Sequence, residues 1–242
     1  MRQAFGTDMN FKVSENWSLT GGWYFGKNGF IDEDVFDKMP EKPHIQLMES
    51  GLAYQKDDRF GLQFLGGIMK EEESLFGMRG AGAFDINGAQ THFMRVVANY
   101  RPNDKIRFSA SYTYGITEAN RANSLLSFSK LTSDSFGIVT EYLPNDKQLF
   151  GFKFTSPLKV RSGSAHFDLP VARDLYEDKV YRETYSTALK STTREYDLSL
   201  FFADEVTSNL SLVGETGVRL KPGHQKNANM DYRALFKLNW KW

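Results

Sequence analysis

Few side chains in this sequence stand at spacings that catalysis or metal binding requires. The four His are at 44, 92, 166 and 224, far apart, whereas metal ligands recur at short fixed spacings. Glu195 and Asp197 stand two apart, and paired carboxylates can perform acid–base chemistry. There is no Cys, so thiol chemistry and disulfides are excluded. We expect no catalytic residue, no cofactor-binding residue and no metal site.

Three further stretches carry chemistry-bearing residue types but fit structural roles better. The segment SGSA (162–165) lacks the flanking pattern of a nucleophilic serine. The glycines at 77, 80 and 82 occupy a long loop that no helix follows, unlike a phosphate-binding loop. The run KEEE (70–73) is typical of a solvated loop rather than a calcium site. We therefore expect that the chain is not an enzyme.

Composition narrows the class of protein. Acidic and basic residues balance at 30 each, so no net charge attracts nucleic acid. The chain contains 20 Phe and 11 Tyr, and aromatic residues favour strands. No apolar run approaches the ~18 residues of a membrane helix, and the opening MRQAFGTDMNFKV lacks the apolar centre of a signal peptide. A mean hydropathy of −0.48 still permits a membrane β-barrel, whose strands are apolar on one face only.

Strict alternation of apolar and polar residues is the main structural signal. In IRFSASYTYGI (106–116) every second residue is apolar and the others are small or polar, which is the period of a half-exposed strand. The last segment, DYRALFKLNWKW (231–242), alternates in the same way and only Leu235 departs from the pattern. A strand that is apolar to its final residue predicts burial there or contact with lipid.

Twelve such strands are predicted, joined alternately by short Pro-, Asn- or Asp-containing turns and by long connections. Short turns at one end and long loops at the other are typical of an outer-membrane barrel. We predict an all-β fold, a transmembrane antiparallel up-and-down β-barrel of about 12 strands over residues 17–242, with 1–16 a linker remnant or partial strand. The predicted strands are 17–26, 43–55, 59–70, 90–100, 106–116, 134–143, 148–160, 163–170, 179–190, 194–203, 210–220 and 231–242.

The strand faces give each side chain a predicted role. Charges inside a barrel need partners or water, and the lumen-facing charges, which Arg194 would join, are Arg107, Lys153, Glu195, Asp197, Glu215, Arg219, Arg233 and Lys237. Amphipathic aromatics prefer membrane interfaces, and the candidates are Tyr100, Tyr142 and Trp240 near the short turns with Tyr114, Tyr196 and Tyr232 near the long loops. A C-terminal insertion signal would comprise Tyr232, Phe236, Leu238, Trp240 and Trp242.

Residues 156–202 carry a more specific resemblance. In SPLKV, SGSA, DLPVAR, VYRETY and TREYDL, the matching residues, in order, are Pro157, Leu158, Val160, Gly163, Leu169, Pro170, Arg173, Tyr181, Arg194, Glu195, Asp197 and Leu198. The segments RLKPGH (219–224) and LFGMRGAGAF (75–84) add to them. Together they resemble the translocator barrel of subtilisin-like serine protease autotransporters, of type V secretion. Lys221 stands where that family usually has Asp, and Thr193 where it has Gly.

The resemblance implies a location, partners and a passive role. Such a barrel lies in the bacterial outer membrane, contacts its lipid and is inserted by the barrel-insertion machinery. It carries an N-terminal passenger, here a subtilisin-like protease outside this chain, whose linker occupies the lumen. We expect a monomer that binds no nucleic acid. A stand-alone pore or surface-binding barrel, with 71–89 and 117–131 as contact loops, is the alternative. A soluble β-sandwich is a third possibility.

Overall fold

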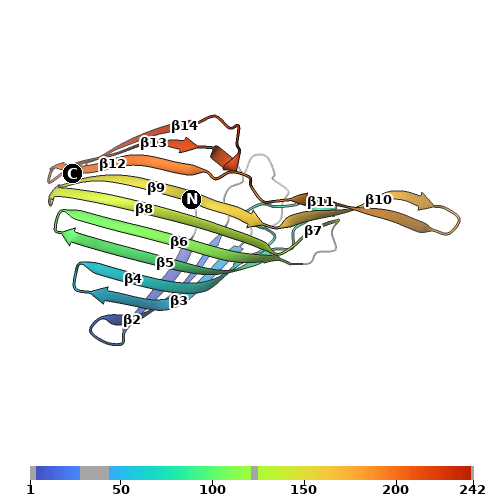
Figure 1. Ribbon diagram of the computed structural model, residues 1–242, viewed down its shortest axis with the longest axis horizontal. Helices are drawn as coiled ribbons and strands as arrows, with labels where there is room; N and C mark the ends of the chain where they lie inside the picture. Colours follow the sequence, from blue (N-terminus) through green and yellow to red (C-terminus); the bar gives the residue numbers. More distant parts are fainter. Residues whose placement is uncertain (1–3, 28–43, 121–124, 241–242) are drawn as a thin grey trace.

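Antiparallel strands dominate the computed structural model, which describes residues 4–27, 44–120 and 125–240. Eleven of them form one continuous sheet, in which neighbouring strands of the series below are hydrogen-bonded to one another (Figure 1). They are β1 (Ala4–Lys12), β2 (Trp17–Lys27), β3 (His44–Lys56), β4 (Phe60–Glu71), β5 (Ala89–Asn103), β6 (Ile106–Ala119), β8 (Leu131–Asn145), β9 (Gln148–Ser162), β12 (Tyr196–Thr207), β13 (Leu210–Leu220) and β14 (Asp231–Trp240).

A second, three-stranded sheet contains β7 (Leu126–Phe128), β10 (Ser164–Asp174) and β11 (Lys179–Ala188). It projects beyond the end of the main sheet (Figure 1). The prediction that 163–170 and 179–190 are two strands of the barrel wall is therefore wrong. Both segments alternate between apolar and polar residues, but β10 and β11 pair with one another as a hairpin. Alternation identifies a strand and does not identify the sheet to which it belongs.

Ion pairs and a hydrogen bond join several polar side chains of the hairpin. Arg182 pairs with Asp168 at 3.1 Å, and Arg173 pairs with Asp178 near the hairpin turn. Tyr185 donates to Glu183 at 2.7 Å, and this bond to a carboxylate raises the pKa of the Tyr185 hydroxyl. All of β11 is exposed, so these contacts lie in solvent and stabilise the hairpin only weakly.

The edges of the main sheet are β1 and β14, and no pairing joins them among the described residues. The sheet nevertheless curls, with its first strands passing behind the middle ones (Figure 1). A closed barrel and a count of twelve strands stay predictions. Within the segment 1–16, residues Ala4–Lys12 form a complete strand, in register with β2 from Gly26 to Ser18. Because the main sheet has an odd number of antiparallel strands, its two ends lie at opposite ends of the strands. β1 begins at the long-loop end and β14 finishes at the short-turn end.

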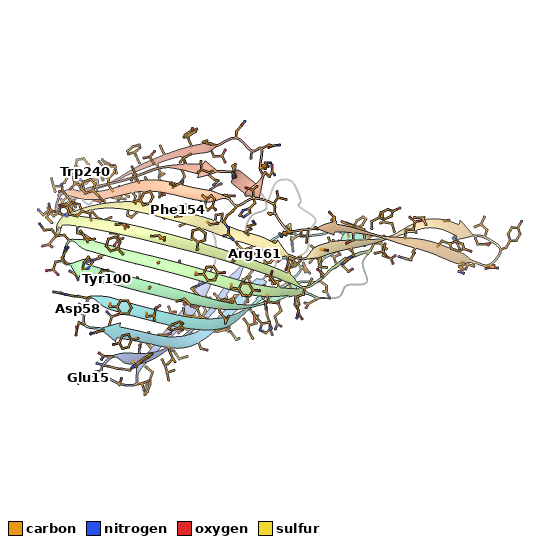
Figure 2. The ribbon with its side chains drawn as sticks, viewed as in Figure 1. Glu15, Asp58, Tyr100, Phe154, Arg161 and Trp240 are labelled. Atoms are coloured by element: carbon orange, nitrogen blue, oxygen red, sulfur yellow. The ribbon has the colours of Figure 1, made fainter. Side chains whose placement is uncertain are left out.

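The register determines which residues share a face. Arg107 stands opposite Glu141, and the same row continues through Gly151 and Phe201 to Glu215. Side chains alternate along each strand, so one face carries most of the charges while the other is largely aromatic and aliphatic. Figure 2 shows Tyr100 and Phe154 on the outer side of the curved sheet. We call these the polar face and the apolar face.

The small buried core lies at the long-loop end. Leu75 and Ile86, from the connection between β4 and β5, pack with Ala89 and Leu131 of the polar face. Within this connection, η1 (Gly82–Phe84) is a single turn of 3-10 helix. The carboxylate of Glu71 accepts the backbone N–H groups of Phe76 and Gly77 at 2.9 and 2.8 Å and so closes the turn. The prediction that KEEE is simply a solvated loop is wrong for Glu71, which is 4% exposed.

Aromatic side chains on the polar face lie against glycines of neighbouring strands. A Cβ added to Gly67 would stand 2.5 Å from the Phe93 ring, and one added to Gly151 would stand 2.1 Å from the ring of Phe201. Each glycine therefore leaves the space that a ring occupies, which lets the strands curve while the surface stays filled.

Candidate functional site

Seven of the eight charges predicted to line the lumen lie on the polar face by register, and Glu195 immediately precedes β12. Lys153 Nζ lies 3.6 Å from Glu215 Oε1, and Arg233 Nη2 lies 3.2 Å from the same oxygen. Glu215 thus links β9, β13 and β14 through one carboxylate. Cations on both sides of an acidic residue reduce the cost of placing these charges on one wall.

Arg219 forms a second group with two predicted acids, Glu195, which directly precedes β12, and Asp197 of β12. Its Nε lies 3.1 Å from Glu195 Oε1 and 3.0 Å from Asp197 Oδ1. Glu195 is 6% exposed and also accepts the backbone N–H of Gly223 at 2.6 Å. Arg219 and the Gly223 N–H thus hold these two carboxylates at the long-loop end of the sheet.

Two predicted charges, Arg107 and Lys237, have no such partners among residues 4–27, 44–120 and 125–240. Arg107 lines a hollow at the short-turn end together with Asp58, Arg101 and Glu141. Lys237 stands opposite Val213 and has no ion-pair or hydrogen-bond partner in the part of the chain that the structure describes. The polar face therefore combines a paired centre with unpaired cations, an arrangement that suits a wetted wall.

The sequence did not predict a further polar group, which lies on β1, β2, β3 and β5. Tyr24 donates to Asp8, and Arg95 Nη1 lies 3.7 Å from Glu49 Oε2. Asp8 lies within 1–16, where we expected a linker remnant or partial strand, and Tyr24 lies on the first predicted strand, 17–26. Residues that face the polar side have even numbers in β1 and β2 and odd numbers in the regular parts of the other strands of the main sheet. The alternation of polar residues in 4–27 could have indicated this group.

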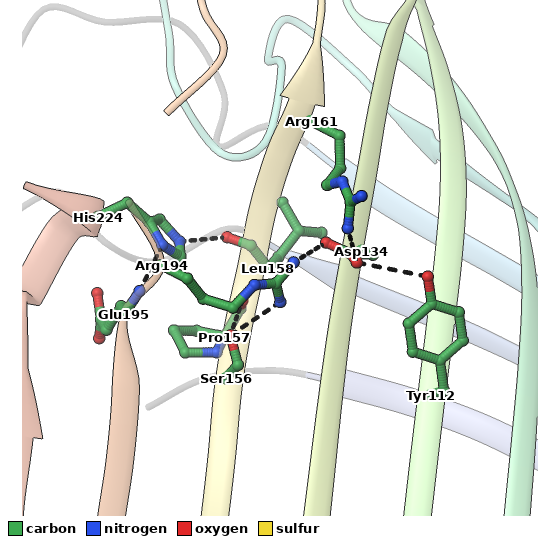
Figure 3. A network of polar contacts seen from close by, with 9 residues as sticks. All are labelled: Tyr112, Asp134, Ser156, Pro157, Leu158, Arg161, Arg194, Glu195 and His224. Atoms are coloured by element: carbon green, nitrogen blue, oxygen red, sulfur yellow. Dashed lines mark hydrogen bonds and ion pairs between the residues drawn. The ribbon is translucent and has the colours of Figure 1, made fainter. Parts of the chain in front are cut away.

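The stretches that carry the family resemblance converge at the long-loop end (Figure 3). His224, from η2 (Pro222–His224), accepts the backbone N–H of Glu195 at Nδ1 (2.9 Å). Its Nε2 must then carry the proton, and it lies 2.9 Å from the carbonyl oxygen of Leu158. One neutral imidazole therefore joins SPLKV, REYDL and RLKPGH, which are far apart along the chain.

Asp134 is the centre of a network on the apolar face beside this junction (Figure 3). It accepts hydrogen bonds from Arg194, from Arg161 Nη1 at 2.9 Å and from the Tyr112 hydroxyl at 3.4 Å. Arg194 also donates to Ser156 Oγ at 3.0 Å. The expectation that Arg194 contributes to the lumen is therefore wrong. It precedes the regular part of β12, and its guanidinium lies over the ring of Phe136, an apolar-face residue.

The predicted interface aromatics lie near the two strand ends on the apolar face. At the short-turn end, Tyr100, Tyr142 and Trp240 are exposed, and Tyr100 stacks on Phe108. At the long-loop end Tyr232 is exposed and Tyr114 is half-buried. Tyr196 packs on Phe154 with ring centroids 5.6 Å apart. Their role as membrane girdles stays a prediction.

The candidate insertion signal forms the apolar face of an edge strand. Tyr232, Phe236, Leu238 and Trp240 all face outward on β14 and are at least 62% exposed. Leu235, the residue that breaks the alternation, faces the polar side opposite Glu215. Trp242 lies outside the described residues.

No family model matches this chain, and neither does any curated protein. Within the described ranges, no helix is long and apolar enough to cross a membrane, and no three His, Cys, Asp or Glu gather as a metal site would require. The four His lie on β3, β5, β10 and η2. The resemblance to autotransporter translocators stays a prediction that rests on the quoted motifs.

Proposed function

We propose that this chain is an outer-membrane β-barrel that anchors an N-terminal passenger and lets it pass to the cell surface. The observation that carries the proposal is the opposition of its two faces. One is ion-paired and rich in glycine, while the other exposes large apolar side chains along β1 to β14. Such a sheet is stable only if something apolar covers the second face.

Lipid fits that face better than a second protein layer does. In a β-sandwich, another sheet would pack about 10 Å away, but the three-stranded sheet lies beyond the end of the main one (Figure 1). On β8 and β9, the face from Phe136 to Tyr142 and from Phe150 to Phe154 carries no charge. Charged residues of this face, such as Lys56, Asp134 and Lys159, stand near strand ends.

Strand length agrees with this environment. The strands of the main sheet contain 9 to 15 residues. At about 3.3 Å per residue, even ten residues tilted by about 45° can cross a bilayer core. The tyrosines and Trp240 at both strand ends would then lie at headgroup level, and the exposed face of β14 would be read by the barrel-insertion machinery.

The passenger role is supported by the motif convergence and by the polar face. β1 begins at the long-loop end, so a segment joined before Ala4 would leave the sheet on the side where the hairpin projects. The paired charges of Glu215 and Arg219 offer an unfolded chain a wet wall without a deep apolar site. The barrel would act as a monomer and supply no energy, and a protease activity would belong to the passenger.

The membrane assignment is tested by folding the purified chain into bilayers. We expect slower mobility on gels after boiling than before, and quenching of Trp17 and Trp23 fluorescence by brominated acyl chains, because both face outward. A fold that is soluble without detergent, with no boiling-dependent shift and no quenching, would leave a β-sandwich instead.

Passenger export is tested separately in a Gram-negative host. An epitope-tagged segment is fused before Met1 behind a signal peptide, and intact cells are treated with protease. Loss of the tag is expected, whereas the same tagged segment without the barrel should stay protected. A tag that is protected although the barrel is heat-modifiable in the membrane fraction would favour the stand-alone pore or surface-binding barrel.

A further inference from the structure

A group of basic side chains lies on the apolar face at its long-loop end. Between Ser156 and Ser162, β9 has two register shifts against β8, and Lys159 stands opposite Asp134 as a result. Arg161 reaches the same carboxylate from the second shift. These irregularities place two cations on a face that the regular alternation of β9 would have kept apolar.

The positive charge of this group exceeds its negative charge. The strongest charge interactions of Lys159 are with three cations, Arg194, Arg161 and Lys190, and with one acid, Asp134. Four cations thus face one carboxylate, and Asp134 is already occupied by Arg161 and Arg194. Among the described residues Lys159 has neither a hydrogen-bond nor an ion-pair partner. The group, Lys159, Arg161, Lys190 and Arg194, therefore has capacity for an external anion.

The position of the basic group restricts the anion to an amphiphile. Next to the basic group, toward the short-turn end, Phe136, Phe154 and Tyr196 form an aromatic cluster with ring centroids 5.6 to 6.4 Å apart. Beyond that cluster the face carries no charge along β8 and β9. An anion bound by Lys159 and Arg161 would lie at the long-loop end of the charge-free part of the apolar face. In a membrane, this is where the headgroup of a lipid meets its acyl chains.

We infer that the basic group binds the phosphate of a phosphorylated lipid headgroup in the outer leaflet. Guanidinium groups present paired N–H donors to phosphate oxygens, and Lys159 adds a compact charge. Arg194 keeps Asp134 as its partner and fixes the position of the group. Arg161 holds Asp134 through Nη1, so its other N–H groups can donate to the ligand, and Lys159 and Lys190 can turn toward it. This inference rests on the proposed membrane location.

The test uses the whole chain folded in neutral detergent micelles, with fluorescent short-chain phosphatidic acid as the probe and phosphatidylcholine of the same chain length for comparison. We expect phosphatidic acid to bind at least tenfold more tightly than phosphatidylcholine. The double variant Lys159→Gln, Arg161→Gln should lose that preference, and Lys159→Gln alone, which breaks no contact, should weaken binding about threefold. Arg194 and Asp134 are left unchanged because they join β8 to β12.

The matched control is Lys221→Gln with Lys226→Gln, two cations of the β13–β14 connection, which should bind like the unchanged chain. Equal binding by the two double variants would overturn the site, as would equal affinity for both lipids. Competition by millimolar inorganic phosphate as effective as that by the lipid would overturn the lipid as ligand. If the double variant fails to fold, the single Lys159→Gln variant decides the matter.

Failure of the proposed function would look different. A chain that folds without detergent and shows no boiling-dependent mobility would remove the membrane location itself, whatever the basic group binds. A heat-modifiable chain that binds both lipids equally would keep the barrel and remove only the phosphate site.

Discussion

Arg194 donates a hydrogen bond to Asp134, 60 residues earlier in the chain and two strands away across β9. The side chain of Asp134 is 4% exposed and that of Arg194 13%. A buried carboxylate that loses its charge leaves its cationic partners uncompensated. This pair therefore fastens the start of β12 to the middle of the sheet at the point where the chain returns from the hairpin.

Asp134→Asn should lower the free energy of unfolding by about 2 to 3 kcal/mol, because Arg194 and Arg161 lose their carboxylate while the side chain keeps its size. Urea unfolding in micelles, followed by Trp fluorescence, measures the change. Asp58→Asn, in an exposed turn, is the control and should change stability by less than about 0.5 kcal/mol. Equal values for the two variants would show that the network contributes nothing.

His224→Ala should expose the backbone N–H of Glu195, which the imidazole accepts at 2.9 Å. One lost hydrogen bond is worth about 1 kcal/mol, so the exchange of this amide should accelerate about fivefold. Hydrogen exchange resolved by mass spectrometry or NMR measures it. His166→Ala, on β10 of the projecting hairpin, should leave Glu195 unaffected, and the same protection in both variants would contradict the bridge.

Gly67→Ala should destabilise the sheet by about 1 to 3 kcal/mol, because the added methyl would stand 2.4 Å from the Met48 carbonyl oxygen and 2.5 Å from the Phe93 ring. The adjacent Gly66→Ala is a close control, since its methyl meets nothing nearer than 3.9 Å. That change should be neutral or slightly stabilising. The midpoint of thermal unfolding compares the two, and equal losses would indicate that backbone freedom, and not ring packing, sets the cost.

Leu75→Ala should loosen the connection between β4 and β5. The side chain is fully buried, and such a truncation costs about 2 to 5 kcal/mol of local packing. Trypsin should then cut after Arg79 faster than in the unchanged chain. Met78→Ala removes an exposed side chain from the same connection and should not alter cleavage. Unchanged cleavage in the Leu75 variant would mean that Glu71 alone holds the connection.

The alternation of apolar and polar residues along single strands determined where most strands of the main sheet lie and which side chains share a face. Hydrophobic period is a local property, so it located most strands of the main sheet within a few residues and put Lys153, Asp197 and Glu215 on one face. The same reasoning explains Leu235, whose odd position sends it to the polar side. Period also indicated an outward apolar face from Tyr232 to Trp240.

Only the tertiary structure decided which strands belong together. The segments 163–170 and 179–190 alternate like any others, yet the hairpin pairs with itself and leaves the main sheet, because strand pairing depends on contacts that period does not encode. The two register shifts in β9 turn Lys159 and Arg161 toward the apolar face, and no local pattern determines such an irregularity. The convergence of Leu158, Glu195 and His224 likewise needs three segments folded against one another. Local sequence therefore determines the faces of strands, whereas the fold determines their neighbours.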